Sequence, residues 1–347
     1  MEKQGKYIYG IIASNSENSF DRCWIMANER ICVIAYRDIA AIISDSEVVD
    51  YTHLRKDILA KQLVKHQMII EGIMPQYAII PMRLGTFAID EAEVKDILSK
   101  GYGLIKKIIP KIIDKIEIDL VATWSDFTSV LKEAGEEKEI KEYKEGLLSS
   151  PKGITVDDQV KIGFMLKKAL DEKREKYALK IQDALKAVGI NYKQHELMDD
   201  KMVVNLAFLI EKAKLKEFYA KVEDLNTEIK ELLNFRCIGP LSAYSFFTLE
   251  IKKIQFNEVD WARKRLGILE DCSSKEGIKI AFRKQVFISH PDRNPDKPGI
   301  EKEYDEITRS YNMLLEYAQA CEQIGQENLI FNEDEFQKNA ILVKVRE

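Results

Sequence analysis

Histidine and cysteine, which build many catalytic and zinc sites, are scarce in this chain of 347 residues, with four histidines and five cysteines. The cysteines are odd in number, widely spaced and without a CxxC pair, which favours reduced thiols in a cytosolic protein over disulfides. They are Cys23, Cys32, Cys237, Cys272 and Cys321. The histidines are scattered, without the close spacing of a zinc-ligand set. We therefore expect neither a metal ion nor a cofactor.

Motifs of several enzyme classes are also missing. The sequence contains no glycine-rich phosphate loop and no GxSxG element. The segment Gly101-Tyr102-Gly103 lacks the third glycine and the preceding strand that a dinucleotide site needs. We predict that the protein is not an enzyme.

Two partner classes are disfavoured by charge and hydropathy. The formal net charge of −5 provides no general basic field for nucleic acid. No apolar run approaches the length of a transmembrane helix, and the apolar residues 7–12 are too few for a signal peptide. We predict no nucleic-acid partner, no membrane span and a location inside the cell.

The length predicts at least two domains, because one hydrophobic core stops growing at roughly 250 to 300 residues. In the first 130 residues, strand and helix signals alternate, and apolar residues recur every three or four positions along residues 54–72. His66 lies on that stripe and is expected to be buried. Strands are predicted at residues 6–13, 31–36, 39–44, 77–84 and 116–124, and helices at 54–72, 90–100 and onward through 113.

A second domain is predicted over residues 157–252, after a charged helix and linker at 131–156. Its predicted helices begin at residues 157 and 215, and its strands lie at 190–196, 202–210 and 235–238. Helices covering mainly antiparallel sheets indicate the α+β class, and we predict two ferredoxin-like α+β domains. The tail, residues 322–347, ends in an apolar run that could form a strand at a sheet edge.

Several segments of residues 5–250 together resemble the GvpF/GvpL family of gas vesicle accessory proteins. They are Tyr7-Ile8-Tyr9-Gly10, Ala40-Ala41-Ile42-Ile43-Ser44, Lys65-His66, Ile80-Pro81-Met82-Arg83-Leu84-Gly85-Thr86-Phe87, residues 203–210, and the Gly239-Pro240 to Tyr244-Ser245-Phe246 ending. The resemblance implies a cytoplasmic, gas-vesicle-associated role without catalysis. It also implies contact with the small apolar shell protein GvpA and with other gas vesicle accessory proteins.

Arg83 is the only charge in an apolar setting within that set. It either pairs with a carboxylate, from a partner or from its own domain, or organises backbone carbonyls near His66. We treat His66 and Arg83 as a possible structural or partner site.

The C-terminal region carries the strongest local signal, His290-Pro291-Asp292, at the end of a predicted basic helix, residues 277–289. Pro291 disfavours helical geometry at His290, so the helix should end there and present His290 and Asp292 on a loop. A third helix with an apolar stripe at Tyr304, Ile307, Tyr311 and Leu314 should close against the second. A metal-ligand role for His290 is disfavoured.

Residues 258–321 resemble an all-α, DnaJ-type J domain with its helical hairpin. The resemblance implies that His290, Pro291 and Asp292 dock on a DnaK-type chaperone and stimulate its ATP hydrolysis. It assigns the basic helix face to Lys275, Lys279, Arg283 and Lys284, a cationic patch suited to an acidic partner. Two departures stand out: Gln285 replaces a usual leucine, and Ile288-Ser289 replaces a usual basic-aromatic pair.

Two functional hypotheses follow from these resemblances. The first is a gas vesicle assembly factor that binds GvpA and recruits a DnaK-type chaperone through its J domain. The alternative is a structural or nucleating minor component of the vesicle, with a degenerate J-like domain that does not stimulate ATP hydrolysis.

Overall fold

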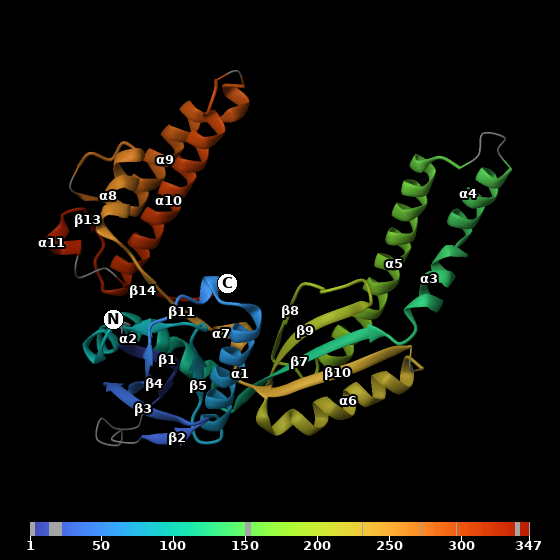
Figure 1. Ribbon diagram of the computed structural model, residues 1–347, viewed down its shortest axis with the longest axis horizontal. Coiled ribbons are helices and arrows are strands. Elements are labelled where there is room, and N and C mark those ends of the chain that lie inside the picture. The colour runs from blue at the N-terminus through green and yellow to red at the C-terminus, as the bar shows by residue number, and fades with distance from the viewer. Residues whose placement is uncertain are drawn as a thin grey trace. The chain divides into compact units, whose positions relative to one another are not determined.

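The computed structural model describes residues 4–13, 23–149, 154–230, 232–270, 272–295, 297–336 and 341–346. The chain forms two compact units (Figure 1). Unit 1 combines Met1–Ile113 with Phe247–Glu347, and unit 2 is Asp114–Phe246. The chain therefore leaves unit 1, builds unit 2, and returns to unit 1 with its C-terminal third.

Unit 1 begins with an antiparallel sheet of strand order β2-β3-β4-β1-β5, in which β6 also pairs with β1. The strands are β1 (Gln4–Ala13), β2 (Trp24–Met26), β3 (Glu29–Tyr36), β4 (Ile39–Glu47), β5 (Ile79–Pro81) and β6 (Phe87–Ala88). A short turn, η1 (Tyr51–His53), precedes α1 (Lys56–Ile73), and α1 and α2 (Glu91–Ile112) pack on the sheet. As predicted, His66 is buried on the sheet-facing side of α1.

Two expected elements of unit 1 differ from the sequence prediction. The predicted helices at 90–100 and through 113 are one continuous helix, α2, which begins after the N-cap Asp90. Its glycines do not break it, and Gly101 instead lies against Val343. The strand predicted at 77–84 covers only Ile79–Pro81, and the next residue, Met82, forms an isolated bridge with Leu249.

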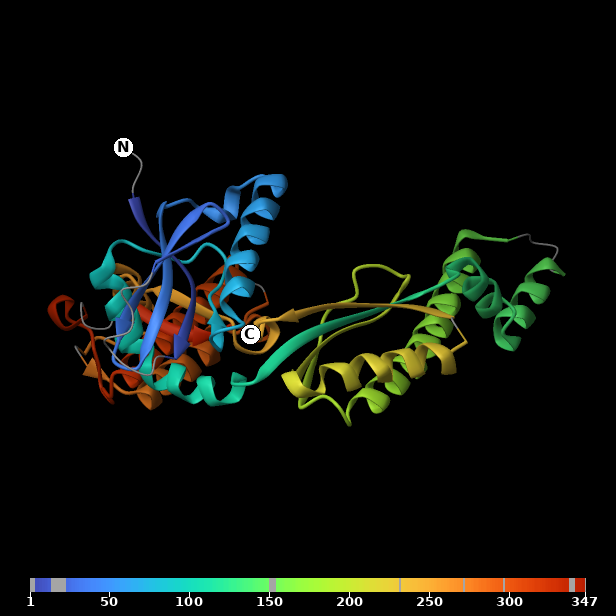
Figure 2. The same ribbon diagram turned by 90° about the horizontal axis from the view of Figure 1, so that it is seen from below.

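Unit 2 contains a four-stranded antiparallel sheet of order β10-β7-β9-β8. The strands are β7 (Lys115–Trp124), β8 (Asn191–Gln194), β9 (Met202–Glu211) and β10 (Leu233–Leu241). The helices are α3 (Phe127–Gly135), α4 (Lys138–Leu148), α5 (Val156–Leu185) and α6 (Leu215–Glu228), with the turn η2 (Lys212–Lys214). Figure 2 shows α5 and α6 on one side of the sheet. The order is the ferredoxin-like one, whereas the sheet of unit 1 is antiparallel with another order.

The predicted boundary between the first two domains is wrong. The prediction places the strand at 116–124 in the first domain, residues 1–130, but this strand, β7, hydrogen-bonds to β9 and β10 at the centre of the second sheet. The boundary therefore lies between Ile113 and Asp114. Residues 131–149 are no linker either, because α3 and α4 pack on α5 and the Tyr143 hydroxyl donates to Asp158 at 2.9 Å. The rest of the predicted linker includes residues 150–153, which lie outside the described residues.

The C-terminal part of unit 1, from Phe247 onward, is mainly helical. The short helix α7 (Tyr244–Phe247) leads into it from unit 2. The elements of this part are β11 (Leu249–Lys253), α8 (Phe256–Arg265), β12 (Cys272–Ser273), α9 (Lys275–Ser289), η3 (Pro291–Arg293), α10 (Ile300–Gln323), β13 (Leu329–Ile330), α11 (Glu333–Phe336) and β14 (Ile341–Val345). Helices α8 and α9 pack against the long helix α10, and the contact of α9 with α10 is the one that the apolar stripe predicts.

The predicted tail, residues 322–347, is not a separate segment. Strand β14 pairs antiparallel with β11, so the expected C-terminal strand exists and finds its partner before α8. Leu329, Phe331, Phe336 and Leu342 share one buried core with α8, α9 and α10. The helical domain is thus inserted between the two strands of a ribbon. Since β11 belongs to this ribbon, the second domain also ends earlier than the predicted residue 252.

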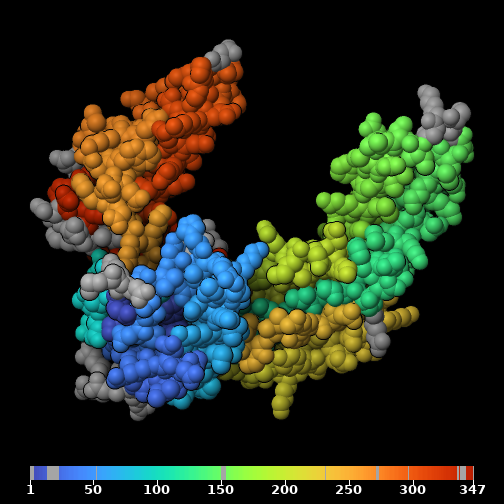
Figure 3. Space-filling model, viewed as in Figure 1, coloured from blue at the N-terminus to red at the C-terminus, as the bar shows by residue number. Residues whose placement is uncertain are grey.

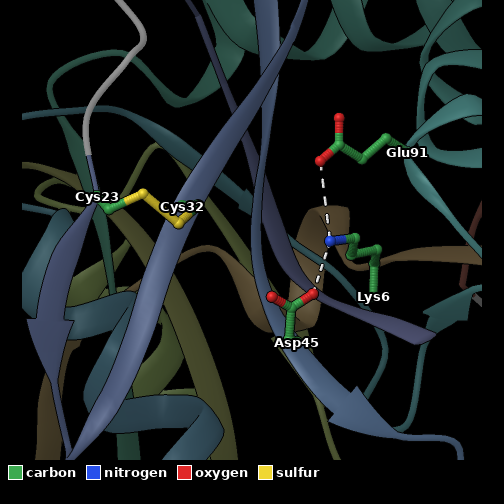
Figure 4. Close-up of a disulfide and its surroundings, with 5 residues drawn as sticks. All are labelled: Lys6, Cys23, Cys32, Asp45 and Glu91. Carbon is green, nitrogen blue, oxygen red and sulfur yellow. Dashed lines mark hydrogen bonds and ion pairs between the residues drawn. A yellow bond between two sulfur atoms is a disulfide. The ribbon is translucent and has the colours of Figure 1, made fainter. Parts of the chain in front are cut away.

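The expectation that all cysteines are reduced is wrong for one pair. Cys23 and Cys32 form a disulfide across the β2–β3 hairpin, whose register places Trp24 opposite Ile31 and so brings the two cysteines together (Figure 4). The same view shows Lys6 between Asp45, at 2.6 Å, and Glu91, at 3.8 Å. Cys237 and Cys321 carry free thiols. Within the described ranges, no helix combines the length and apolar character of a membrane span.

Candidate functional site

The end of α9 is determined by local chemistry. Ser274 caps its start by accepting a hydrogen bond from the Gly277 N–H at 3.1 Å. His290 has extended backbone geometry, with φ −70° and ψ 129°, and the turn η3 follows at Pro291. The predicted break before Pro291 is therefore confirmed, and His290 and Asp292 lie on the connecting loop.

The loop is held by several contacts. The His290 Nδ1 atom accepts a hydrogen bond from the Asp292 N–H at 3.2 Å, and its ring packs edge-on against Tyr304 with centroids 5.6 Å apart. The Asn294 amide donates to the carbonyls of Ile288, at 2.9 Å, and His290, at 3.1 Å. The His290 side chain is 35% exposed and that of Asp292 is 89% exposed. The Asp292 side chain thus projects into solvent from a turn that hydrogen bonds hold in place.

The helical frame around the loop agrees with the predicted stripe. Ile307 and Leu314 of α10 are fully buried. Phe282 of α9 stacks on Tyr311 of α10, with ring centroids 4.0 Å apart and planes 13° from parallel. This packing fixes α9 against α10 and so positions the loop between them.

The four predicted basic residues are not equivalent. Lys275 reaches Glu322 at the end of α10, at 2.9 Å, and Lys279 lies 3.4 Å from Glu276. Arg283 and Lys284 are exposed, and across the described part of the chain neither has an ion pair. Of these four residues, Arg283 and Lys284 are therefore the ones without an ion pair among the described residues. They lie on α9, whose residues are orange in Figure 3.

Sequence reasoning missed an apolar component of the same helix surface. Ile280 is 59% exposed, Phe287 64% and Ile288 55%. Ile280 and Phe287 each lie about one helical turn from Arg283 and Lys284, at spacings of three and four residues. The guanidinium of Arg293 sits 3.9 Å from the centre of the Phe287 ring. The signal was present in residues 280–288, which are apolar on the outer as well as the inner face.

The two departures from the expected J-domain pattern have structural partners. The Gln285 side-chain amide approaches the Leu266 carbonyl at 3.4 Å, where α8 ends. Ser289 is fully buried, and its hydroxyl donates to Glu303 at 2.9 Å. Both residues therefore pack into the helical domain, and neither leaves a hole in it.

His66 and Arg83 do not form one site. The His66 Nδ1 atom lies 2.8 Å from the Tyr7 hydroxyl, and burial lowers the pKa of His66 to about 4. The Arg83 side chain is 55% exposed and pairs with Glu250 of β11 at 3.4 Å. Of the alternatives for Arg83, the structure supports a carboxylate from its own unit.

A buried polar cluster in unit 2 was also missed. Both carboxylate oxygens of Glu117 accept from Ser245, one from its N–H at 2.8 Å and one from its hydroxyl at 2.7 Å. His195 Nε2 lies 3.0 Å from the same hydroxyl. Burial raises the pKa of Glu117 to about 8, and burial also raises the pKa of Asp119. No group of three or more metal-ligating side chains occurs among the described residues, and we regard this cluster as structural.

The family model described as gas vesicle synthesis protein GvpL/GvpF matches residues 5–248. The chain belongs to this family. A DnaJ domain model matches residues 264–320, so the J-domain resemblance is confirmed.

Individual GvpF proteins agree with the family match. Gas vesicle protein F of Streptomyces sp. (strain CB03234) is 22% identical over 242 residues, covering 69% of this chain and 98% of the relative. The crystal structure of GvpF from Anabaena sp. PCC7120 superimposes with a TM-score of 0.60 and 18% identity, over 71% of this chain and 98% of that one. This GvpL/GvpF member therefore shares the fold of GvpF.

The match to DnaJ is local. The chaperone protein DnaJ of Salinibacter ruber is 42% identical over 66 residues, which are 18% of this chain but only 17% of that DnaJ. The GvpL/GvpF member thus carries a J domain without spanning the rest of a DnaJ protein.

Proposed function

We propose that this GvpL/GvpF member is a non-enzymatic gas vesicle assembly factor located in the cytoplasm and at the vesicle shell. It binds the apolar shell protein GvpA, and through its J domain it recruits a DnaK-type chaperone and stimulates ATP hydrolysis by that chaperone. The observation that carries the proposal is the intact His290-Pro291-Asp292 loop, held between α9 and α10 with the Asp292 side chain 89% exposed.

The surface next to the loop suits an acidic protein partner. Arg283 and Lys284, which have no ion pair with any residue that the structure describes, supply positive charge, and such charge accelerates the encounter with a negative surface. Phe287, which is 64% exposed, supplies apolar area that gains free energy when a partner covers it. Helix α9 thus carries both the charge that would speed the encounter with the partner and the apolar area that would stabilise the complex.

Attachment of the J domain to a vesicle protein gives the chaperone a defined client. The β11–β14 ribbon joins both ends of the J domain to the rest of unit 1, and Glu250 of the ribbon forms ion pairs with Arg83 and Lys344. A chaperone docked on this domain has a high local concentration near any subunit that the family domains bind. GvpA, as an apolar shell protein, is the client that would need protection from aggregation.

The test measures ATP turnover by a DnaK-type chaperone with the intact chain added. We expect stimulation, and we expect His290→Gln to abolish it while leaving the fold unchanged. His53→Gln is the matched control, because the His53 side chain is 88% exposed outside the J domain. Equal turnover with the wild-type chain and His290→Gln would sink the co-chaperone proposal.

A second candidate is a structural or nucleating vesicle component with a non-stimulating J-like domain. The departures at Gln285 and Ser289 favour it, because both side chains are used for internal contacts. The same ATPase assay separates the candidates, since this one predicts no stimulation by the wild-type chain. Under both, the full-length protein should capture GvpA in a pull-down. Failure to capture GvpA would contradict the proposal that GvpA is the client, but not the proposed contact with the chaperone.

A further inference from the structure

A second surface of the J domain lies between α8 and α10, away from the His290 loop. Helix α8 buries Val259, Ala262 and Leu266 in the core of the domain. Trp261, in contrast, points outward and is 41% exposed. A tryptophan left this open gains free energy from any partner that covers its ring.

Trp261 borders a groove of about 240 Å³ lined by Asn257, Glu258, Trp261, Arg309 and Met313. The Arg309 guanidinium lies 5.8 Å from the centre of the Trp261 ring. Pockets that hold small molecules or cofactors usually have roughly 300 to 1,000 Å³. The size of the groove therefore suits one large side chain of a peptide better than a cofactor.

Two charges at the groove remain without ion pairs in the portion of the chain that the structure describes, Arg309 and Glu258. Their neighbours are paired, as Asp260 is with Arg263 and Lys264, at 2.8 and 2.6 Å. Arg309 can therefore bind an incoming carboxylate without first breaking an internal pair, whereas Glu258 repels one that approaches its side.

The groove is separate from the proposed chaperone surface. Tyr304 and Tyr311 mark the side of α10 that meets His290 and Phe282 of the α9 region. Arg309 lies five residues after Tyr304 and two before Tyr311, so at about 100° per residue it points to roughly the opposite side of the helix. A ligand of the groove can bind while α9 is engaged.

We propose that this groove is a peptide-docking site for a partner protein, which inserts an apolar side chain over Trp261 and Met313 and places an adjacent carboxylate on Arg309. Tryptophan, arginine and methionine are the residue types enriched in the cores of protein interfaces. The apolar platform supplies affinity, and the cation selects acidic over basic segments. This inference does not rest on the gas vesicle or chaperone roles.

The experiment uses the full-length protein and two fluorescein-labelled ten-residue peptides that differ at one position. One carries Leu-Glu at its centre and the other carries Leu-Lys. Fluorescence anisotropy should show saturable binding of the Leu-Glu peptide below roughly 1 mM, and at least about 10-fold weaker binding of the Leu-Lys peptide. Trp261→Ala should weaken binding of the Leu-Glu peptide by about 10-fold or more.

Charge variants make the test specific. Arg309→Glu should reverse the preference between the peptides. Glu258→Gln should tighten binding of the Leu-Glu peptide, because it removes a like charge. Lys302→Glu makes the same change of charge as Arg309→Glu elsewhere on α10, at an exposed position, and should leave the preference intact. His290→Gln should also bind normally, while it tests the chaperone role separately.

Two results would overturn the docking site. One is absence of saturable binding by the wild-type chain, and the other is an unchanged peptide preference in Arg309→Glu. Circular dichroism melting of each variant confirms that a loss of binding is not a loss of fold. Because ATPase stimulation is measured independently, failure of the groove and failure of the proposed function are distinguishable.

Discussion

The Ser289 hydroxyl donates a hydrogen bond to the Glu303 carboxylate across 2.9 Å, joining the last residue of α9 to the first turn of α10. Lys297 also reaches this carboxylate, at 2.9 Å, from the loop between the helices. These contacts hold the pKa of Glu303 below its ordinary value, with Lys297 the larger cause and Ser289 the next. One carboxylate thus ties both sides of the His290 loop together.

Ser289→Ala should therefore loosen the loop without unfolding the protein. The lost bond should lower the free energy of unfolding by about 1 to 2 kcal/mol, because Ser289 is fully buried and its acceptor is charged. Hydrogen exchange should rise at residues 290–294. Asn312→Ala on the exposed side of α10 serves as the control, and equal exchange in both variants would contradict the role given to Ser289.

Removal of single charges should distinguish the members of the basic helix face. Arg283→Ala and Lys284→Ala should each raise several-fold the concentration needed for half-maximal stimulation of a DnaK-type chaperone, most clearly at low salt. Lys275→Ala should have little effect, because Lys275 already pairs with Glu322 at 2.9 Å. A larger effect from Lys275 than from Arg283 would contradict this ranking.

Reductant should destabilise the first sheet selectively. The Cys23–Cys32 disulfide spans a sequence separation of 9, for which loop closure contributes about 2 to 3 kcal/mol. Cys23→Ser with Cys32→Ser should therefore melt at a lower temperature than the oxidised wild type, and reductant should not lower its midpoint further. Cys237→Ser, at a free thiol, is the control. If mass spectrometry of the oxidised protein detected no linked Cys23–Cys32 peptide, the result would contradict the disulfide.

The helical hairpin around Pro291 could be predicted from the sequence because its determinants are local. A proline sets the break, and residues three and four apart set the packed face. The sheet to which β7 belongs could not be predicted in this way. Alternation along Lys115–Trp124 identifies a strand but does not identify its neighbours, which come from β9 and β10.

The buried cluster of unit 2 escaped prediction for a related reason. Glu117 and Asp119 are two residues apart on a strand, which in sequence resembles a solvent-facing edge. Their partners, His195 and Ser245, arrive from segments far along the chain. The groove at Trp261 likewise needs α8 and α10 to meet before Arg309 reaches the ring.

The stability of unit 2 should fall as the pH rises. Burial raises the pKa of Glu117 from 4.5 to about 8, so the folded protein keeps a proton that the unfolded chain has already released. The stabilisation that this proton contributes is complete below about pH 4.5. As the pH rises toward 8, the free energy of unfolding falls by at most about 1.4 kcal/mol per pH unit.

Glu117→Gln tests this assignment. The amide oxygen can accept from the Ser245 N–H, as the carboxyl oxygen does, but an amide cannot ionise. The variant should therefore lose most of the fall in melting temperature between pH 6 and pH 8.5. Glu139→Gln, at an exposed position of α4, should keep the wild-type profile. A Glu117→Gln profile parallel to that of the wild type would show that another group titrates.

Two glycines of the same helix should respond oppositely to alanine. A Cβ at Gly101 would meet Val343 of β14 at 3.0 Å and Ile105 at 3.1 Å, whereas a Cβ at Gly103 would meet nothing within 4 Å. Gly103→Ala should stabilise α2 by up to about 1 kcal/mol, because alanine is the better helix former. Gly101→Ala gains the same propensity but pushes β14 away, and overpacking of this kind costs about 1 to 3 kcal/mol.

The pair separates helix propensity from the attachment of the J domain. Thermal unfolding should place Gly101→Ala below and Gly103→Ala above the wild type. Hydrogen exchange in Gly101→Ala should rise along β14, where the Val343 N–H donates to the Gln323 side chain at 3.3 Å, and along its partner β11. If both variants were stabilised equally, α2 and β14 would not be in contact, and the ribbon alone would hold the J domain on the N-terminal part of unit 1.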